Sequence, residues 1–330
     1  MWNFLECAVQ GRGHIKDNIP CQDKTYSIQE DEVYIIALAD GAGSARYSHI
    51  GADSTVRNAA HYLSRNFDII YNSDNAFIVK QNIINNILEE LNAISLAQNI
   101  SLKDLASTLL LVAVKGDNFI IFHIGDGVIG YLKDEELKIA SHPENGEFAN
   151  STIFTTSTQV IRDSKIIKGN LSGIEGFVLM SDGSADSLYS KTQKKLAPII
   201  SRLMQLSRTS NREILELALL DSFTNNVRKK TLDDCSINMM SYNREPFEGF
   251  NKLSEMGQYN LLGLPYKNNY KKGFKNAYEI LNSAIDGKTI DEIAQDLQIK
   301  PKYLPKKLKR LTQKELLIRF DSKYYTLITL

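Results

Sequence analysis

Hydrophobic and polar residues alternate along residues 1–243 with two periods, one typical of strands and one typical of helices. Short apolar runs predict strands at 26–39 (a hairpin turning at 30–32), 108–115, 118–124, 128–132, 136–140, 153–158, 177–181 and 236–242. Apolar spacings of three and four predict helices at 50–66, 75–99, 191–205 and 211–225. This order predicts an α+β fold with mostly antiparallel sheets and helices packed on their outer faces.

The pattern changes after residue 243. Residues 244–273 are richer in Gly, Asn, Pro and Lys and have little periodicity, so we read them as a connector. Helical periodicity then returns at 274–285, 289–297 and 301–313, followed by strand-like pieces at 316–320 and 324–328. Three helices and a hairpin are the plan of a winged helix-turn-helix. We therefore expect domains at 1–243 and 274–330, joined by 244–273.

Charge is distributed unevenly along a chain that is neutral overall. Residues 251–330 contain fifteen Lys and Arg against eight Asp and Glu, a net charge of +7, so the remainder carries −7. This polarity favours two modules with different roles, and ordinary variation between solvated faces is the alternative.

Composition excludes several classes of protein. No apolar run approaches the ~20 residues that cross a membrane, and the first residues lack the basic and apolar regions of a secretory signal. Three scattered cysteines are too few for a disulfide framework or a zinc knuckle. The expected location is the cytoplasm, with no membrane partner.

Three predicted strands run directly into Asp-Gly, at Asp40-Gly41, Asp126-Gly127 and Asp182-Gly183. Such a strand delivers a carboxylate to a sheet edge, and the glycine lets the chain turn sharply. A single Asp-Gly is more often a turn than a ligand. Three of them, joined by Asp23 and the acidic pair Asp233-Asp234, predict carboxylates that converge on a hard cation such as Mg²⁺ or Mn²⁺. No His-x-x-x-His or Cys-x-x-Cys accompanies them, which argues against zinc.

An ordered series of short motifs resembles the metal-dependent PP2C-type (PPM) protein phosphatases over residues 5–242. The motifs are Cys21-Gln22-Asp23, Ala39-Asp40-Gly41-Ala42-Gly43, Ala106-Ser107-Thr108, Ile124-Gly125-Asp126-Gly127, Ser181-Asp182-Gly183 and Asp233-Asp234-Cys235-Ser236-Ile237. Residues 146–152 also resemble a bacterial branch of the family. The resemblance implies a four-layer α/β-β/α sandwich of two antiparallel sheets, with the metals at one end.

The resemblance also implies roles for the acidic residues. Asp40 matches the carboxylate that bridges two metal ions, with the Gly41 carbonyl beside it, and Asp23 matches an acidic position near the first ion. Asp182 and Asp233 match the remaining ligands of the other ion. A water activated between the two ions would attack a phosphomonoester in line, without a nucleophilic Cys or Ser.

Two acidic positions leave a choice open. The family pattern Asp-Asn/Asp-x-Ser/Thr favours Asp233 over Asp234 as the ligand, because Ser236 follows Asp233 by three residues. Asp126 lies where some members hold a third metal ion and others stabilise the loop, and both roles remain open.

The sequence departs from the family at two functional positions. Ala42 stands where many members have a histidine proposed as general acid, and nearby His49 is either its substitute or a structural residue. Residues 18–20 occupy the place of the usual phosphate-binding arginine. The cationic groups available for that role are Arg12, His14, Lys16 and Arg46.

The second helix of the winged-helix-like segment is strongly basic. Lys302, Lys306, Lys307, Lys309 and Arg310 would line its outer face, together with Lys300. Such a face contacts phosphates in DNA-binding members. Early Pro305 and the scarcity of base-reading side chains keep two alternatives open, a protein or intramolecular docking surface and a solvated face.

The sequence thus predicts a metal-dependent serine/threonine protein phosphatase with a C-terminal targeting or regulatory module. Its partners would be a phosphorylated protein and, through the C-terminal domain, DNA or another protein. The alternative is a catalytically weak phosphatase-like sensor coupled to a nucleic-acid-binding winged helix.

Overall fold

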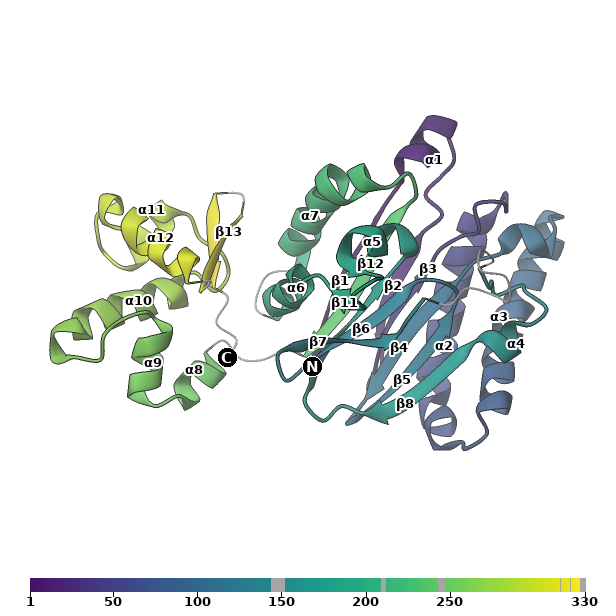
Figure 1. Ribbon diagram of the computed structural model, residues 1–330, viewed down its shortest axis with the longest axis horizontal. Helices are drawn as coiled ribbons and strands as arrows, with labels where there is room; N and C mark the ends of the chain where they lie inside the picture. Colours follow the sequence, from purple (N-terminus) through teal and green to yellow (C-terminus); the bar gives the residue numbers. More distant parts are fainter. Residues whose placement is uncertain (144–151, 209–211, 243–246, 315, 321, 327–330) are drawn as a thin grey trace. The chain divides into compact units, whose positions relative to one another are not determined.

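A computed structural model describes residues 1–143, 152–208, 212–242, 247–314, 316–320 and 322–326 (Figure 1). The chain divides into two compact units. The large unit comprises Trp2–Ser201 and Leu219–Ser241, and the small unit comprises Arg202–Ala218 and Tyr242–Leu330 together with Met1. Two helices, α6 (Ile199–Ser207) and α7 (Arg212–Ser222), cross the boundaries between these segments.

Two five-stranded sheets form the large unit. The first has the order β2 (Lys24–Glu30), β3 (Val33–Ala39), β4 (Leu109–Lys115), β5 (Asn118–Ile124) and β8 (Lys165–Asn170), and its neighbours pair antiparallel. The second has the order β1 (Trp2–Val9), β12 (Cys235–Tyr242), β9 (Ile174–Met180), β6 (Val128–Lys133) and β7 (Glu136–Ser141).

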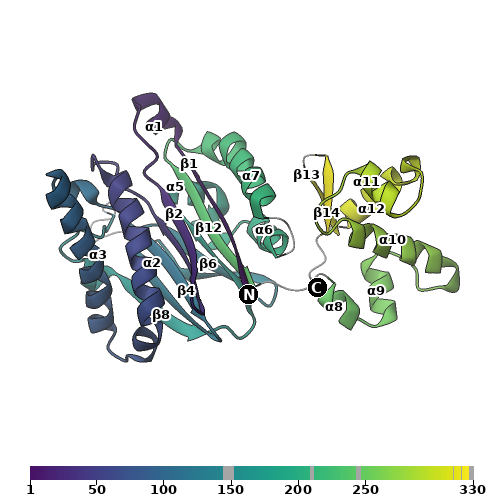
Figure 2. The ribbon, with the colours of Figure 1, turned by 180° about the vertical axis from the view of Figure 1, so that it is seen from behind.

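Alternation of apolar side chains on these strands produces two cores. Ile36 and Leu38 of β3 face Phe177 and Leu179 of the other sheet, in a cluster of buried residues between the two sheets. The intervening residues of β3, such as Ile35, pack instead against the long helices α2 (Ser48–Asn72) and α3 (Ala76–Gln98). Figure 2 shows both helices covering the first sheet. The predicted α+β architecture of facing antiparallel sheets with helices outside is confirmed.

Strand register brings the acidic loops to one end of each sheet. Lys24 pairs with Ala39, so Asp23 and Asp40 extend from the same end of the β2–β3 pair. Ile237 pairs with Met180, so the residues before β12 and after β9 also lie at a common end. Distant sequence positions are therefore brought together by antiparallel pairing alone.

Shorter elements complete the large unit. They are α1 (Arg12–Asp17), η1 (Leu102–Leu105), α4 (Val160–Asp163), α5 (Asp182–Leu188), the hairpin β10 (Tyr189–Ser190) and β11 (Lys195–Leu196), the π-helical η2 (Phe223–Val227) and the 3₁₀-helical η3 (Arg228–Lys230). A Cβ on Gly130 would lie 2.4 Å from Leu196, which places the β10–β11 hairpin on the outer face of the second sheet.

The small unit has its own core. Its elements are α8 (Glu248–Lys252), α9 (Glu255–Leu261), η4 (Asn268–Tyr270), α10 (Lys271–Ser283), α11 (Ile290–Asp296), η5 (Pro301–Tyr303), α12 (Pro305–Gln313) and the antiparallel pair β13 (Leu317–Phe320) and β14 (Lys323–Thr326). Lys288 forms an additional bridge with Tyr324. Thr289 and Glu292 form the capping box expected from their spacing.

The segment interpreted as a connector differs from that expectation in its described part. Residues from Phe247 onward form α8 and α9, and Phe250, Tyr259 and Leu262 are buried in the small-unit core. Phe250 and Tyr259 both stack on Phe274 of α10. Because α8 and α9 are very short, their buried aromatic residues produce no sustained helical periodicity, and the sequence pattern therefore did not predict these helices.

Three further expectations are wrong. Residues 153–158 form turns rather than a strand, because the Ser157 hydroxyl accepts the Phe154 N–H and its own N–H returns to the Phe154 carbonyl. The first part of the helix expected at 191–205 is the β10–β11 hairpin. Pro305 separates η5 from α12 within the helix expected at 301–313, since proline lacks the N–H that would continue it.

All three cysteines are free. None of the helices in the described ranges has the length and apolar character that crossing a membrane would require.

Candidate functional site

Asp40 is fixed to the segment that precedes β4. Its backbone N–H donates to the Thr108 hydroxyl at 2.8 Å, and its carbonyl accepts the Thr108 N–H at 2.8 Å. Gly41 bridges with Ser107, and a Cβ at Gly41 would lie 2.8 Å from both Cβ and Oγ of Ser48. Only glycine allows the chain to turn this close to the start of α2.

Asp182 is held by contacts between β9 and β12. The Ser181 hydroxyl accepts the Ser236 N–H at 3.0 Å, while the Ser181 N–H donates to the Ser236 carbonyl at 3.2 Å. A Cβ on Gly183 would stand 2.2 Å from the Asp234 carbonyl oxygen. The second Asp-Gly turn therefore packs directly against the loop that carries the acidic pair.

Asp233 and Asp234 have different surroundings. The buried carboxylate of Asp234 accepts the N–H groups of Gly11 at 2.6 Å and Gln22 at 2.5 Å. Nδ1 of His14 lies 2.9 Å from Oδ1 of Asp234, although without the angles of a hydrogen bond. The Asp233 carboxylate is more exposed and accepts only the N–H of Asp234, at 2.9 Å, among the hydrogen bonds of the described residues.

Burial and mutual repulsion raise the pKa values of the clustered carboxyl groups. Burial, then the charges of Asp23, Asp182 and Asp233, raises the pKa of Asp40 well above its usual range. Burial, then Asp126 and Asp233, raises the pKa of Asp182 to about 6. The pKa of Asp233 is raised chiefly by burial. Carboxylates that repel one another in this way are a site for positive charge.

Asp23 provides a test of whether a cation fits. Its side chain is buried, and neither carboxylate oxygen has a hydrogen-bond partner. Burial, and then repulsion from Asp234, raises the pKa of Asp23 to about 7. The nearby Ser181 and Ser236 hydroxyls offset part of this rise, although neither forms a hydrogen bond with the Asp23 carboxylate. Unpartnered buried oxygens of this kind suit a hard cation or its bound water.

In the described ranges, no three His, Cys, Asp or Glu side chains converge on a single ion position. Mg²⁺ and Mn²⁺ do not require such a set, because Mg²⁺ is commonly bound through one or two carboxylates and several waters. The oxygen-only chemistry of Asp23, Asp40, Asp182 and Asp233 therefore fits a pair of hard cations, with backbone carbonyls and water completing each shell.

Asp126 lies in the Gly125-Asp126-Gly127 turn after β5. It accepts a hydrogen bond from the Thr152 hydroxyl at 2.6 Å and raises the pKa of Asp182. Both the loop-stabilising and the ligand interpretations of Asp126 are compatible with these contacts. The motif at 146–151 lies outside the described residues.

The cations expected to bind phosphate fall into two groups. Arg12, His14 and Lys16 are on α1, and Arg12 Nε donates to the Thr231 carbonyl at 3.1 Å. Arg46 lies in the turn before α2, with its guanidinium over the ring of Tyr47 at 5.4 Å. The first group is attached to the loop that carries Asp233, and the second follows the Asp40 turn.

The position expected for a general acid is apolar. Ala42 packs with Ala45, Ala106 and Phe154 in a small buried cluster. His49, its candidate substitute, is on α2, where its Nδ1 is buried without a hydrogen-bond partner. Burial, then the charge of Lys24, lowers the pKa of His49, which favours its neutral form.

Sequence reasoning missed two residues that organise the site. Thr108 orients Asp40, and its only signal was its place in the Ala106-Ser107-Thr108 motif. Asp234 joins the segments after β1 and before β2 through Gly11 and Gln22. Backbone partners at such sequence separations cannot be read from a single chain.

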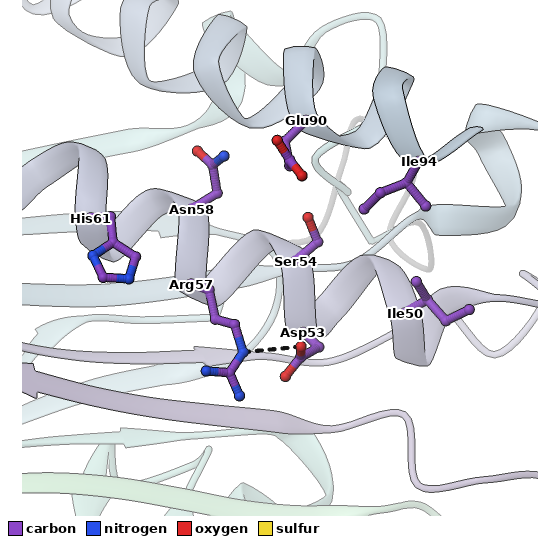
Figure 3. A pocket seen from close by; sticks show the side chains of 8 residues that line it. All are labelled: Ile50, Asp53, Ser54, Arg57, Asn58, His61, Glu90 and Ile94. Carbon is purple, nitrogen blue, oxygen red and sulfur yellow. Dashed lines mark hydrogen bonds and ion pairs between the residues drawn. The ribbon is translucent and has the colours of Figure 1, made fainter. Parts of the chain in front are cut away.

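The large unit also has a polar groove, of about 360 Å³, between α2 and α3 (Figure 3). Its lining consists of Ile50, Asp53, Ser54, Arg57, Asn58, His61, Glu90 and Ile94. Arg57 pairs with Asp53 at 3.0 Å and lies over the Tyr26 ring at 4.7 Å. None of the clustered carboxylates contributes to this groove, so it is separate from the acidic centre.

Comparison with known proteins identifies the family. The family model described as protein phosphatase 2C matches residues 10–221, more than half of the chain. Serine/threonine-protein phosphatase 3 of Escherichia coli (strain K12) is 27% identical over 168 residues, which span 48% of this chain and 65% of that protein. The match thus covers slightly less than two thirds of this curated relative.

Solved structures share the fold at low sequence identity. A bacterial serine phosphatase superposes with a TM-score of 0.53 at 13% identity, covering 74% of this chain and 100% of that one. The serine/threonine phosphatase of S. agalactiae gives 0.52 at 18% identity with the same two coverages. Facing antiparallel sheets with acidic loops at one end thus define a phosphatase-type fold. The chain belongs to the protein phosphatase 2C family.

Proposed function

We propose that this protein hydrolyses phosphoserine or phosphothreonine in proteins with two bound Mg²⁺ or Mn²⁺ ions. The observation that carries the proposal is the cluster around Asp40, whose pKa is raised by burial and then by the charges of Asp23, Asp182 and Asp233, which come from distant positions in the chain. When bound, the ions would lower the pKa of the attacking water and offset charge on the phosphoryl oxygens.

The protein's own residues would position these components. Asp40, oriented by Thr108, would hold the ions together with Asp23, Asp182 and Asp233. Arg12 and Lys16 on α1 would attract the phosphoryl group, because α1 is attached to the 231–234 loop through Arg12 and Gly13. With Ala42 at the usual histidine position, solvent is the simplest source of the leaving-group proton.

The test is phosphate release from p-nitrophenyl phosphate and a phosphothreonine peptide, with and without Mn²⁺ or Mg²⁺. We expect activity only with metal, and loss of at least about 100-fold in kcat/KM for Asp40→Asn, since a metal ligand and its charge are removed. Asp186→Asn is the matched control, because Asp186 is an exposed aspartate of α5 that pairs only with Lys191 among described residues. Equal activity of Asp40→Asn and the wild-type protein would refute the proposal.

As a second candidate function we propose that the small unit binds duplex DNA through α12. Lys306 and Lys309 are exposed on this helix, while Leu308 and Leu311 are buried on the opposite face. Lys302 lies over the exposed ring of Tyr303 at 5.2 Å, directly before α12. The order α10, α11, α12 and β13–β14 supports a winged-helix interpretation, and such helices meet phosphates through lysine.

A further inference from the structure

A second basic segment lies beside the acidic centre and has no role in the chemistry described above. It is η3, formed by Arg228, Lys229 and Lys230, which directly precedes the loop 231–234. That loop is attached to α1, because Arg12 donates to the Thr231 carbonyl at 3.1 Å and Gly13 donates to the Leu232 carbonyl at 2.8 Å. On its other side η3 contacts α5, whose first residue is Asp182.

The charges of this segment are available for a partner. Lys229 and Lys230 are exposed and Arg228 is half-buried. None of the three makes an ion pair or hydrogen bond through its side chain with a described residue. Unpaired cations beside a site attract anionic substrates and raise their local concentration.

The distance from η3 to the acidic centre matches a short stretch of peptide. Lys230 and Asp233 are three residues apart, so their Cα atoms are separated by at most ~11 Å. An extended peptide advances ~3.3 Å per residue, so a carboxylate two to four residues from a phosphorylated side chain lies roughly 7–13 Å away. A substrate bound with its phosphate at the acidic centre would therefore bring its acidic neighbours to η3.

We propose that η3 selects phosphorylated protein segments that carry Asp or Glu two to four residues from the phosphorylated Ser or Thr. This inference rests on the proposed phosphatase function and names its substrate class. Charge complementarity favours an acidic peptide over a neutral or basic one, because the three cations of η3 have no acidic partner among the described residues. The selectivity belongs to substrate binding, so it is expressed mainly in KM.

The experiment compares three phosphothreonine peptides that differ only in the flanking residues, which are Glu, Ala or Lys. For the full-length wild-type protein with Mn²⁺ we expect kcat/KM to be about fivefold or more higher for the Glu peptide than for the Ala peptide, as several weak surface ion pairs provide. The triple variant Arg228→Glu, Lys229→Glu, Lys230→Glu should reverse this preference. In 0.5 M salt the wild-type preference should shrink, because exposed charges are screened.

The matched control is Lys191→Glu, Lys194→Glu, Lys195→Glu in the β10–β11 hairpin, which makes the same charge change at exposed sites of the same unit. It should keep the wild-type ratio between peptides. If the η3 triple variant does not fold, the single change Lys229→Glu at an exposed position provides the same test with a smaller effect. Reading the ratio between peptides removes any general change in activity.

Two negative results have different meanings. Hydrolysis of all three peptides with equal kcat/KM, or an unchanged preference in the η3 variant, would overturn the proposed selectivity and leave the phosphatase function intact. No metal-dependent hydrolysis of any peptide or of p-nitrophenyl phosphate would instead overturn the phosphatase function, and the selectivity with it.

Discussion

At the scale of single residues, the adjacent carboxylates of Asp233 and Asp234 differ in burial and in the number of backbone N–H groups that they accept. Asp234 is buried and satisfies two backbone N–H groups, so its charge is compensated by the protein itself. Asp233 faces Asp40 and Asp182, whose charges oppose its own. Asp234 is therefore a structural acceptor, and Asp233 is the one of the pair that we propose as a metal ligand.

These environments predict opposite effects of the same substitution in metal-free protein. Asp234→Asn replaces one carboxylate oxygen with an NH2 group, so one of the two backbone N–H groups loses its acceptor. The free energy of unfolding should fall by about 1–3 kcal/mol. Asp233→Asn keeps one oxygen for the Asp234 N–H and removes a repelling charge, so stability should be unchanged or higher. Urea denaturation in EDTA measures both.

Binding of Mn²⁺ completes this comparison. Asp233→Asn should weaken Mn²⁺ affinity by about 10–100-fold in calorimetric titration, because a charged oxygen at the centre is lost. A result in which Asp234→Asn costs no stability, or Asp233→Asn costs more than Asp234→Asn, would contradict the roles given to the two residues.

At the scale of elements, the Asp-Gly turns form the site because glycine permits the close approach of loops from different strands. Gly41 and Gly43 stand two residues apart in the same turn and have different surroundings. A Cβ at Gly41 would meet Ser48 at 2.8 Å and Gln22 at 3.0 Å, whereas a Cβ at Gly43 would meet nothing within 4 Å. The sequence gives no indication of this difference.

Gly41→Ala should therefore destabilise the protein by about 1–3 kcal/mol, since the new methyl group forces the turn away from α2. It should also weaken Mn²⁺ binding, because Asp40 moves with the turn. Gly43→Ala is the matched control and should stay within about 0.5 kcal/mol of the wild-type protein. Denaturant midpoints and Mn²⁺ titrations of both variants test the prediction, which fails if the two variants behave alike.

The sequence predicted those elements whose signal is local. Strands at 108–115 and 118–124 were recovered closely, because continuous apolar runs flank a Gly-Asp turn. Strand β1 was not predicted. The turns at 153–158 were interpreted as a strand, because the apolar pattern does not reveal that the Ser157 side chain bonds to nearby backbone and so competes with sheet pairing. In the small unit, the aromatic residues of α8 and α9 acquire their meaning only by packing on α10.

The candidate site was predictable to a similar degree. A carboxylate after a buried strand is a local signal, so Asp40, Asp126 and Asp182 stood out in the sequence. The hydrogen bonds from Asp40 to Thr108 and from Gln22 to Asp234 join positions 68 and 212 residues apart. Such contacts follow from strand register, and therefore appear only once the fold is known.

At the scale of the whole molecule, each of the two units has an exposed basic segment, η3 on the large unit and α12 on the small unit. On the small unit, α12 exposes lysines that no described acidic side chain pairs with, while its apolar residues complete the core. On α10, Lys271, Lys272 and Lys275 are also exposed, and they belong to a different helix from α12. The lysines of α12 can therefore be changed as the test, and those of α10 as the control.

Duplex DNA should be retarded by the full-length protein in a gel-shift assay, with an affinity that falls as salt rises, because lysines displace counterions from phosphates. The triple variant Lys306→Glu, Lys307→Glu, Lys309→Glu should lose at least about tenfold in affinity and reduce the slope of log affinity against log salt by about three. The variant Lys271→Glu, Lys272→Glu, Lys275→Glu carries the same charge change and should bind nearly as the wild-type protein does. Equal losses in both variants would mean that net charge alone drives binding, and undiminished binding of the first would exclude α12 as the contact.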